Sequence, residues 1–209
     1  MTELERIAAF WKWFEQNNRN YLFINQVEDL EVRDGLLDDF IIQLHQYCEH
    51  LYFEMGGHED AEEIELVITA EGDRQYFPKV ELLVDHAPKI KGWTFVKFKQ
   101  AQGSDFKTSY RGREYDPSET IFIPLHSKEE PQGVGIRICY PDYSELERDD
   151  FYNGTYLMLD VLLGEKSTTL DIDYLEIIAT PEDIGRYEFL HIDQLPAFIL
   201  EKKGKLRTH

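Results

Sequence analysis

The order of secondary structure is plainest in residues 64–99, which read IELVITAEGDRQYFPKVELLVDHAPKIKGWTFVKFK. Apolar and polar side chains alternate over residues 64–70, and this two-residue period predicts a strand with one covered face. Pro78 suits the first turn of a helix, because the N–H that proline lacks has no partner there. That helix is expected to end at Pro88, and residues 93–99 then predict a second strand.

Helices are predicted on the N-terminal side of this stretch. Thr2 and Glu5 form a capping box, and apolar residues then recur at helical spacing to about Asn17. A second apolar stripe predicts a helix over residues 36–48. On the C-terminal side, residues 106–112 predict one arm of a hairpin and its turn.

The rest of the chain shows a similar order of elements. Strands are predicted over residues 120–126 and 134–140, and a helix capped by Ser144 and Glu147 follows them. The alternation that starts at Leu170 predicts the next strand. A short last helix is expected before the basic end of the chain.

These elements predict an α+β protein with a largely antiparallel sheet and helices mainly on one face. We expect residues 1–200 to form a single compact domain, since no flexible linker interrupts them. Within it, residues 51–116 and 117–180 can be described as two strand-strand-helix-strand halves, and a true duplication stays open. The basic residues 201–209 are expected to fray as a tail.

The composition limits the classes of partner. The 209 residues include 22 Lys and Arg against 41 Asp and Glu, so the formal net charge is −19. Hydrophobic residues make up 42% of the chain, which is enough to form a core and excludes an acidic disordered segment. Phosphate recognition needs clustered positive charge, and we therefore expect no nucleic acid as a partner.

The chain also lacks the patterns of export and membrane insertion. Residues 1–10 have no basic region followed by an apolar run, so they do not predict a secretory signal. The most apolar window, residues 156–163, is too short to span a membrane. Cys48 and Cys139 are expected to be reduced, buried thiols of a cytoplasmic protein.

Residues 68–99 resemble an uncharacterised bacterial domain family of unknown function. The resemblance lies in turns and helix ends, at Ala70-Glu71-Gly72, Phe77-Pro78, Ala87-Pro88 and Gly92-Trp93, with weaker likeness at Leu159–Glu165 and Phe10–Phe14. Some members of that family are joined to a segment similar to the ribonuclease E inhibitor RraB, an acidic protein that binds an enzyme. No such segment is recognisable here, and the matching residues imply a fold without implying a reaction.

One cluster contains residue types that bind zinc. His45, Cys48, His50 and His58 are close in sequence, and the first two could face the same way on a helix. The alternative is a buried thiol beside surface histidines. We favour the alternative and expect no structural metal, because no second pair of Cys or His completes a tetrahedral set.

Carboxylates and glycine-rich loops are two further kinds of residue pattern that can form a catalytic or binding site. Glu165, Asp171 and Asp173, with Asp160, could form a metal or acid/base site, but the solvent-facing side of a strand is the simpler interpretation. No Gly-x-Ser-x-Gly elbow and no glycine-rich loop before a helix occurs. The sequence therefore predicts no catalytic residue and no cofactor.

The sheet face opposite the inward residues is the predicted binding surface. With Leu66 and Val96 taken as inward, it mixes aromatic area with charges of both signs, as contact faces do. The residues assigned to it are Glu63, Glu65, Trp93, Phe95, Lys97, Lys99, Arg137, Asp171 and Asp173. The alternative is that the two glutamates pair with the two lysines across strands, while the N-terminal helices cover the aromatics.

Together these observations favour a non-enzymatic binding module. A surplus of negative charge speeds the capture of basic proteins and repels nucleic acid and anionic membranes. The expected partner is a basic protein, and inhibition of a nuclease or an immunity-type role is one concrete version. The alternative is an enzyme or small-molecule binder with a pocket between the two halves near Trp93.

Overall fold

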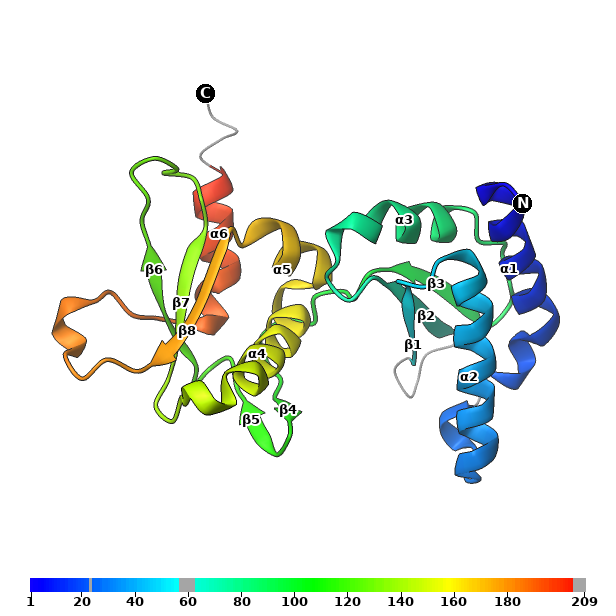
Figure 1. Ribbon diagram of the computed structural model, residues 1–209, viewed down its shortest axis with the longest axis horizontal. Helices are drawn as coiled ribbons and strands as arrows, with labels where there is room; N and C mark the ends of the chain where they lie inside the picture. Colours follow the sequence, from blue (N-terminus) through cyan, green and yellow to red (C-terminus); the bar gives the residue numbers. More distant parts are fainter. Residues whose placement is uncertain (23, 57–62, 205–209) are drawn as a thin grey trace. The chain divides into compact units, whose positions relative to one another are not determined.

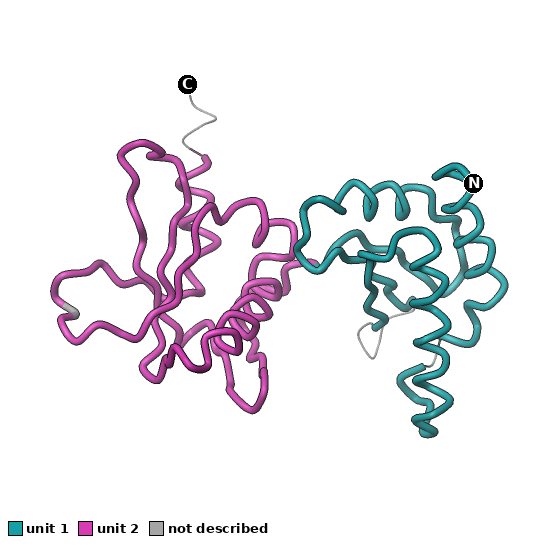
Figure 2. Tube along the Cα trace, viewed as in Figure 1, with its two compact units in different colours: residues 1–99 teal, residues 100–209 magenta. Residues whose placement is uncertain are grey.

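The computed structural model describes residues 1–22, 24–56 and 63–204 (Figure 1). The chain divides into two compact units, residues 1–99 and residues 100–209 (Figure 2). Each unit has a hydrophobic core of its own. The expectation of one domain over residues 1–200 stays a prediction.

The N-terminal unit contains three α-helices and a three-stranded sheet among its described residues. These are α1 (Glu3–Asn17), α2 (Leu30–Tyr47), β1 (Tyr52–Gly56), β2 (Ile64–Thr69), α3 (Phe77–Asp85) and β3 (Trp93–Lys97). The predicted capping box at Thr2 is confirmed, since the hydroxyl of Thr2 accepts from the backbone N–H of Glu5 and the Glu5 carboxylate accepts from that of Thr2. Helix α2 begins earlier than expected, because Asp29 caps it.

The first sheet has the order β1-β2-β3, with β1 antiparallel and β3 parallel to β2. Strand β1 was missed in the sequence, where no clear alternation marks it. Aromatic rings of the helices pack against aromatic rings of the sheet. The ring centroids of Phe14 in α1 and Trp93 are 4.9 Å apart, and those of Phe40 in α2 and Phe53 in β1 are 4.1 Å apart. The helix α3 crosses over between β2 and β3 (Figure 1).

The C-terminal unit contains a small hairpin, a four-stranded sheet and three α-helices among its described residues. They are β4 (Thr108–Tyr110), β5 (Arg113–Tyr115), β6 (Ile121–Leu125), β7 (Gly135–Tyr140), α4 (Arg148–Leu163), α5 (Glu165–Asp171), β8 (Tyr174–Ala179), β9 (Leu190–His191) and α6 (Leu195–Gly204). The order in the larger sheet is β8-β7-β6-β9. Its core face carries Ile136 and Ile138 of β7 and packs with α4 and α6.

Two predicted boundaries in this unit were wrong. A strand was expected from residue 170, but residues 170 and 171 are the last two residues of helix α5. This helix forms because the chain turns at Gly164, whose φ is 80°, and becomes helical again directly after it. The predicted tail is helical to Gly204, because α6 continues and Lys203 is held by an ion pair with Asp171 at 2.6 Å. Residues 205–209 lie outside the described residues.

The predicted fold class is confirmed. Within the described residues, four of the six strand pairs are antiparallel. Both units contain a strand-strand-helix-strand order: β1, β2, α3 and β3 in one, and β6, β7, α4 and β8 in the other. In each, the first two strands are antiparallel and the third is parallel to the second, because a helical crossover returns the chain in the same direction.

Candidate functional site

The residues predicted for one binding face belong to two different sheets and do not share a face. Trp93 and Phe95 are in β3 of the first sheet, and Arg137 is in β7 of the second. Asp171 ends α5, and Asp173 lies between that helix and β8. The predicted surface is therefore not one continuous sheet face.

Trp93 and Phe95 lie on the helix-covered face, which corrects the prediction that they point outward. The parallel register pairs Leu66 of β2 with Phe95, so the two side chains share a face. Trp93 is only 4% exposed and contacts α1, as does Phe95, whose ring lies 4.7 Å from that of Trp11. The prediction assumed that Phe98, which is buried, continues the alternation of β3, so that Val96 would also face inward. Phe98 instead has a left-handed backbone with φ 62°, which breaks the alternation after β3.

The charged residues of this region also pair differently from the cross-strand alternative. Lys97 pairs with Asp85 of α3, their nearest atoms being 2.5 Å apart. The Lys99 ammonium group lies 2.7 Å from Glu71 and 3.5 Å from Glu54. The alternative was correct that the N-terminal helices cover the aromatic rings. It was wrong that Lys97 and Lys99 pair with Glu63 and Glu65.

Glu63 directly precedes β2, and Glu65 is the second residue of that strand. Glu63 accepts a hydrogen bond from the Thr94 hydroxyl at 2.5 Å, and Glu65 is exposed and stands across from Thr94 in the register. Val67, on the same face as Glu65, is half-buried. This face thus keeps a carboxylate and an apolar side chain, and it lacks the two aromatic rings that were assigned to it.

In the second sheet, Arg137 points away from the face that packs with α4 and α6. Its guanidinium donates to Glu176 of β8 at 2.7 Å. The Asp171 carboxylate accepts hydrogen bonds from Lys203 and Ser167. Burial acts to raise the pKa of this carboxyl, but the two hydrogen bonds outweigh burial and the pKa is lowered. Asp173 accepts from the backbone N–H of Val134 at 2.8 Å, so it fixes the start of β7.

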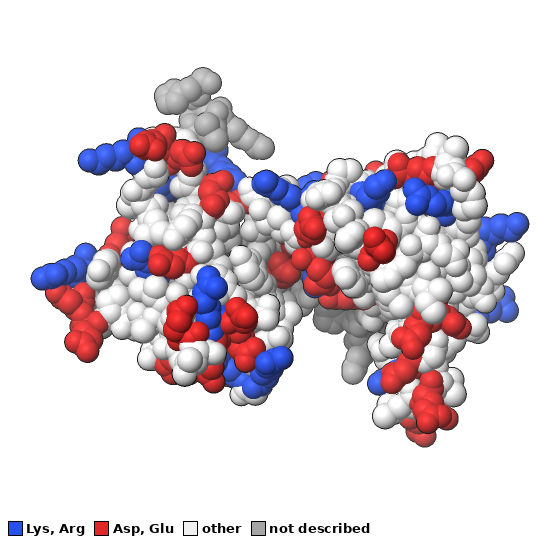
Figure 3. Space-filling view, in the orientation of Figure 1, with Lys and Arg blue, Asp and Glu red and all other residues white. Residues whose placement is uncertain are grey.

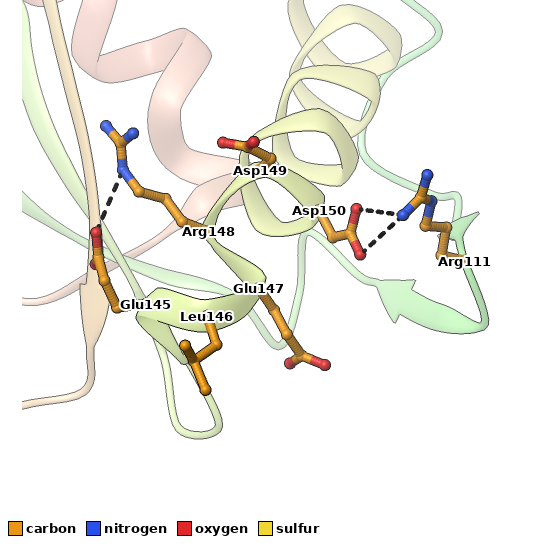
Figure 4. Close-up of a pocket in the computed structure, with 7 residues that line it drawn as sticks. All are labelled: Arg111, Glu145, Leu146, Glu147, Arg148, Asp149 and Asp150. Atoms are coloured by element: carbon orange, nitrogen blue, oxygen red, sulfur yellow. Dashed lines mark hydrogen bonds and ion pairs between the residues drawn. The ribbon is translucent and has the colours of Figure 1, made fainter.

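A surface hollow of about 390 Å³ lies where the β4–β5 hairpin meets the start of α4 (Figure 4). We call it the hairpin hollow. Its lining residues are Arg111, Glu145, Leu146, Glu147, Arg148, Asp149 and Asp150. A neighbouring hollow of about 350 Å³ adds Arg113, Tyr115 and Asp142, and shares Arg111, Glu147 and Asp150.

Ion pairs fix most of the arginines around the hairpin hollow. Arg113 stacks on the Phe151 ring at 4.0 Å and pairs with Asp142 and Glu147. Arg111 pairs with Asp150 at 3.1 Å, although its side chain is 69% exposed. Five carboxylates and three guanidinium groups line the two hollows, so their net charge is −2.

The hairpin turn places Arg111 at its tip. Arg111 and Gly112 have φ values of 49° and 83°, as in the type I′ turn that joins two strands through two residues. A non-glycine residue in this conformation is strained by about 1 kcal/mol or more. The sequence showed the turn through Gly112, and it gave no sign that the hairpin would meet α4.

Burial raises the pKa of Tyr115 and of Cys139 in this unit. Tyr115 donates its hydroxyl to the carbonyl of Asp150, and burial raises the pKa of that hydroxyl. Cys139, in β7, is 1% exposed, and burial raises the pKa of its thiol to about 11. Charged side chains paired with one another are suited to contact with a partner's surface.

Three of the four residues in the histidine and cysteine cluster are among the described residues. The His45 ring lies 3.1 Å from the carbonyl oxygen of Leu51, and the His50 ring stacks on Tyr76 at 4.0 Å. His58 lies outside the described residues. In the part of the chain that the structure describes, no three His, Cys, Asp or Glu side chains are grouped as a metal site. Nor is any helix there long and apolar enough to cross a membrane.

Comparisons with known proteins found no match among protein-family models, curated proteins or solved structures.

Proposed function

We propose that this chain is a non-enzymatic binding module for a protein with a basic surface. The observation that carries the proposal is the net charge of −19. Carboxylate groups are spread over the visible surface of both units (Figure 3). Such a field accelerates encounter with basic proteins and disfavours acidic ones.

The hairpin hollow is the contact surface that we assign to this function. Leu146 is 98% exposed at its rim, beside Glu145 and Asp149. The Asp149 carboxylate has no ion pair among the described residues, and Figure 4 shows it apart from the paired groups. An exposed apolar side chain among carboxylates favours a partner that brings a small apolar patch surrounded by Lys or Arg.

The alternative of a ligand pocket near Trp93 has less support. Trp93 packs into the aromatic core of the N-terminal unit, which leaves little of its surface for a ligand. Its indole N–H lacks a hydrogen-bond partner among the described residues, at a cost of about 1–3 kcal/mol. That orphaned donor alone does not outweigh the charge of the whole chain.

The test is the salt dependence of association with a partner captured from a lysate and then purified. Raising the ionic strength from about 0.01 M to 0.15 M shortens the Debye length from about 30 Å to 8 Å. We expect the association rate constant to fall markedly and the dissociation rate constant to change little. Association that is indifferent to salt would contradict the proposal.

Variants locate the contact. Neutralising Glu145 and Asp149 together, as Glu145→Gln with Asp149→Asn, is expected to weaken binding several-fold, because it removes two charges at the hollow. The matched control is Glu63→Gln with Glu65→Gln, which removes the same charge from the first sheet. A larger effect from the control pair would move the contact to that sheet and remove it from the hollow.

A further inference from the structure

Strand β8 is the outer strand of the second sheet. It pairs with β7 on one side, and none of the described residues forms a strand on its other side. Within residues 1–22, 24–56 and 63–204, no hydrogen bond reaches the backbone of Leu175, Ile177 or Ala179 from that side. The strand therefore presents a row of unpaired backbone groups.

The contacts with β7 show which backbone groups point outward. The N–H of Tyr174 donates to Val134 at 3.2 Å, and the N–H of Thr180 donates to Tyr140 at 3.1 Å. Backbone groups alternate in direction along a strand, so the even-numbered N–H groups of β8 point to β7. Those of Leu175, Ile177 and Ala179 point to the outer edge.

Strand β8 lacks three of the features that protect natural edge strands, namely Lys, Pro and a bulge. Strand β8 reads YLEIIA, with neither Lys nor Pro and with β-branched and aromatic side chains. All six residues pair with β7 in a regular register, without a bulge. An edge of this kind is a template for a further strand.

We propose that the outer edge of β8 binds an extended basic segment of the partner protein as an added β-strand; this inference rests on the proposed function and names its mode of binding. The charges around β8 support a basic occupant. Six carboxylates and one Arg lie between residues 171 and 188. Three of them have no ion pair among the described residues: Asp173, Glu182 and Glu188.

The same charges argue against a second copy of this chain as the occupant. Two β8 strands side by side would bring two acidic segments together, on chains that each carry a net charge of −19. A basic segment would instead be attracted. Main-chain hydrogen bonds along the edge supply affinity in such complexes, and alternate side chains supply specificity.

The side chains of β8 specify the pattern of that segment. On the face opposite the core, the strand presents Tyr174, Glu176 and Ile178 in alternation with the inward residues. Tyr174 is exposed, and the Glu176 carboxylate is about one third exposed beside Arg137. A complementary strand would place Lys or Arg across from Glu176 and apolar side chains across from its two neighbours.

The C-terminal end of β8 and the chain that leads to the hairpin hollow are both hydrogen-bonded to Tyr140. After the C-terminal end of β8, the backbone N–H of Thr180 donates to the carbonyl oxygen of Tyr140. The backbone N–H of Tyr143, which lies on the chain that leads to Glu145, donates to the same oxygen.

The experiment uses the whole chain and a synthetic ten-residue peptide of alternating Lys and Val, blocked at both ends. Amide hydrogen exchange is measured by NMR with and without the peptide. We expect the amides of Leu175 and Ala179 to exchange at least about tenfold more slowly when the peptide is bound, because an added strand would accept their hydrogen bonds. A peptide of alternating Glu and Val is expected to give no protection.

Two variants test the edge itself. Ala179→Pro removes one outward backbone N–H donor and leaves the hydrogen bonds to β7, so peptide binding should weaken about fivefold to tenfold. The control variant Ala179→Ser keeps this donor and should bind the peptide as the unchanged chain does. Glu182→Gln with Glu188→Gln should weaken binding at low salt, and Glu15→Gln with Glu28→Gln is the charge-matched control on the other unit.

The outcomes separate this inference from the proposed function. If a basic protein binds with the expected salt dependence but the β8 amides gain no protection and Ala179→Pro has no effect, the function stands and the edge assignment is wrong. Protection of the β8 amides that rises with protein concentration in the absence of peptide would show pairing with a second copy, and would also overturn it.

Discussion

Replacing Gly154 by Ala should destabilise the C-terminal unit, although the same change stabilises most helices. Gly154 is buried in α4, where the ring of Tyr115 lies directly over it. A methyl group at Gly154 would fall well inside the roughly 3.5–4.0 Å at which carbon atoms normally meet, against the Cζ and Cε2 atoms of that ring. The clash is therefore with a rigid group.

The Tyr115 ring has little room to move aside. It is 1% exposed, its hydroxyl donates to the carbonyl of Asp150 at 3.1 Å, and its ring meets that of Tyr140 edge-on at 5.7 Å. Overpacking of a core costs about 1–3 kcal/mol, and we expect the upper end here. The gain in helix propensity from Gly to Ala offsets about 1 kcal/mol. The net loss in the free energy of unfolding should be about 2 kcal/mol.

The measurement is urea unfolding of the single variants and of a double variant. In the Tyr115→Leu background the ring is absent, so Gly154→Ala should become neutral or stabilising by up to about 1 kcal/mol. Gly35→Ala is the matched control: Gly35 lies in α2, a methyl group there would contact nothing within 4 Å, and stabilisation is expected. If Gly154→Ala stabilises the unchanged chain as Gly35→Ala does, the packing of Tyr115 on α4 is wrong.

Three further results are expected. Hydrogen bonds from the hydroxyl and backbone N–H of Ser118 lower the pKa of Asp116 to about 2, so this carboxylate stabilises the fold above about pH 4 and that stabilisation is lost as pH falls toward 2. Ser118→Ala should lower the free energy of unfolding at pH 6 and have a smaller effect at pH 2; an equal loss at both would refute the role of this charge. Cys139 should resist a disulfide reagent at pH 8 until the chain unfolds, because its thiol is buried and protonated, and rapid labelling of the native chain would contradict this. The fragments 1–99 and 100–209 should each fold with a cooperative transition measured by circular dichroism, since each has its own core; a fragment that stays unfolded would favour one domain over residues 1–200.

Local signals were sufficient for most elements of this chain. The capping box at Thr2, the proline at the start of α3 and the alternation of β2 act within a few residues, so the sequence alone showed where these elements begin and that they exist. Their order then predicted the α+β class. The excess of carboxylates, which carries the proposed function, is likewise a property of composition.

The faces of the strands depended on pairing between distant residues. Trp93 shares a face with Ile64 because β3 runs parallel to β2 in that register, and no signal within β3 specifies its partner. The left-handed backbone at Phe98 gave a misleading phase, since a buried residue after a strand need not continue its alternation. The predicted binding face failed for this reason.

The candidate surfaces were decided by tertiary structure alone. The meeting of the hairpin with α4 joins Arg111 to Asp150, and the unpaired edge of β8 exists because the sheet ends there. Helix caps and periodicity reflect interactions between near neighbours, which a linear sequence records directly. Hollows and edges depend on which segments pair across long stretches of chain, and many pairings satisfy the same local pattern.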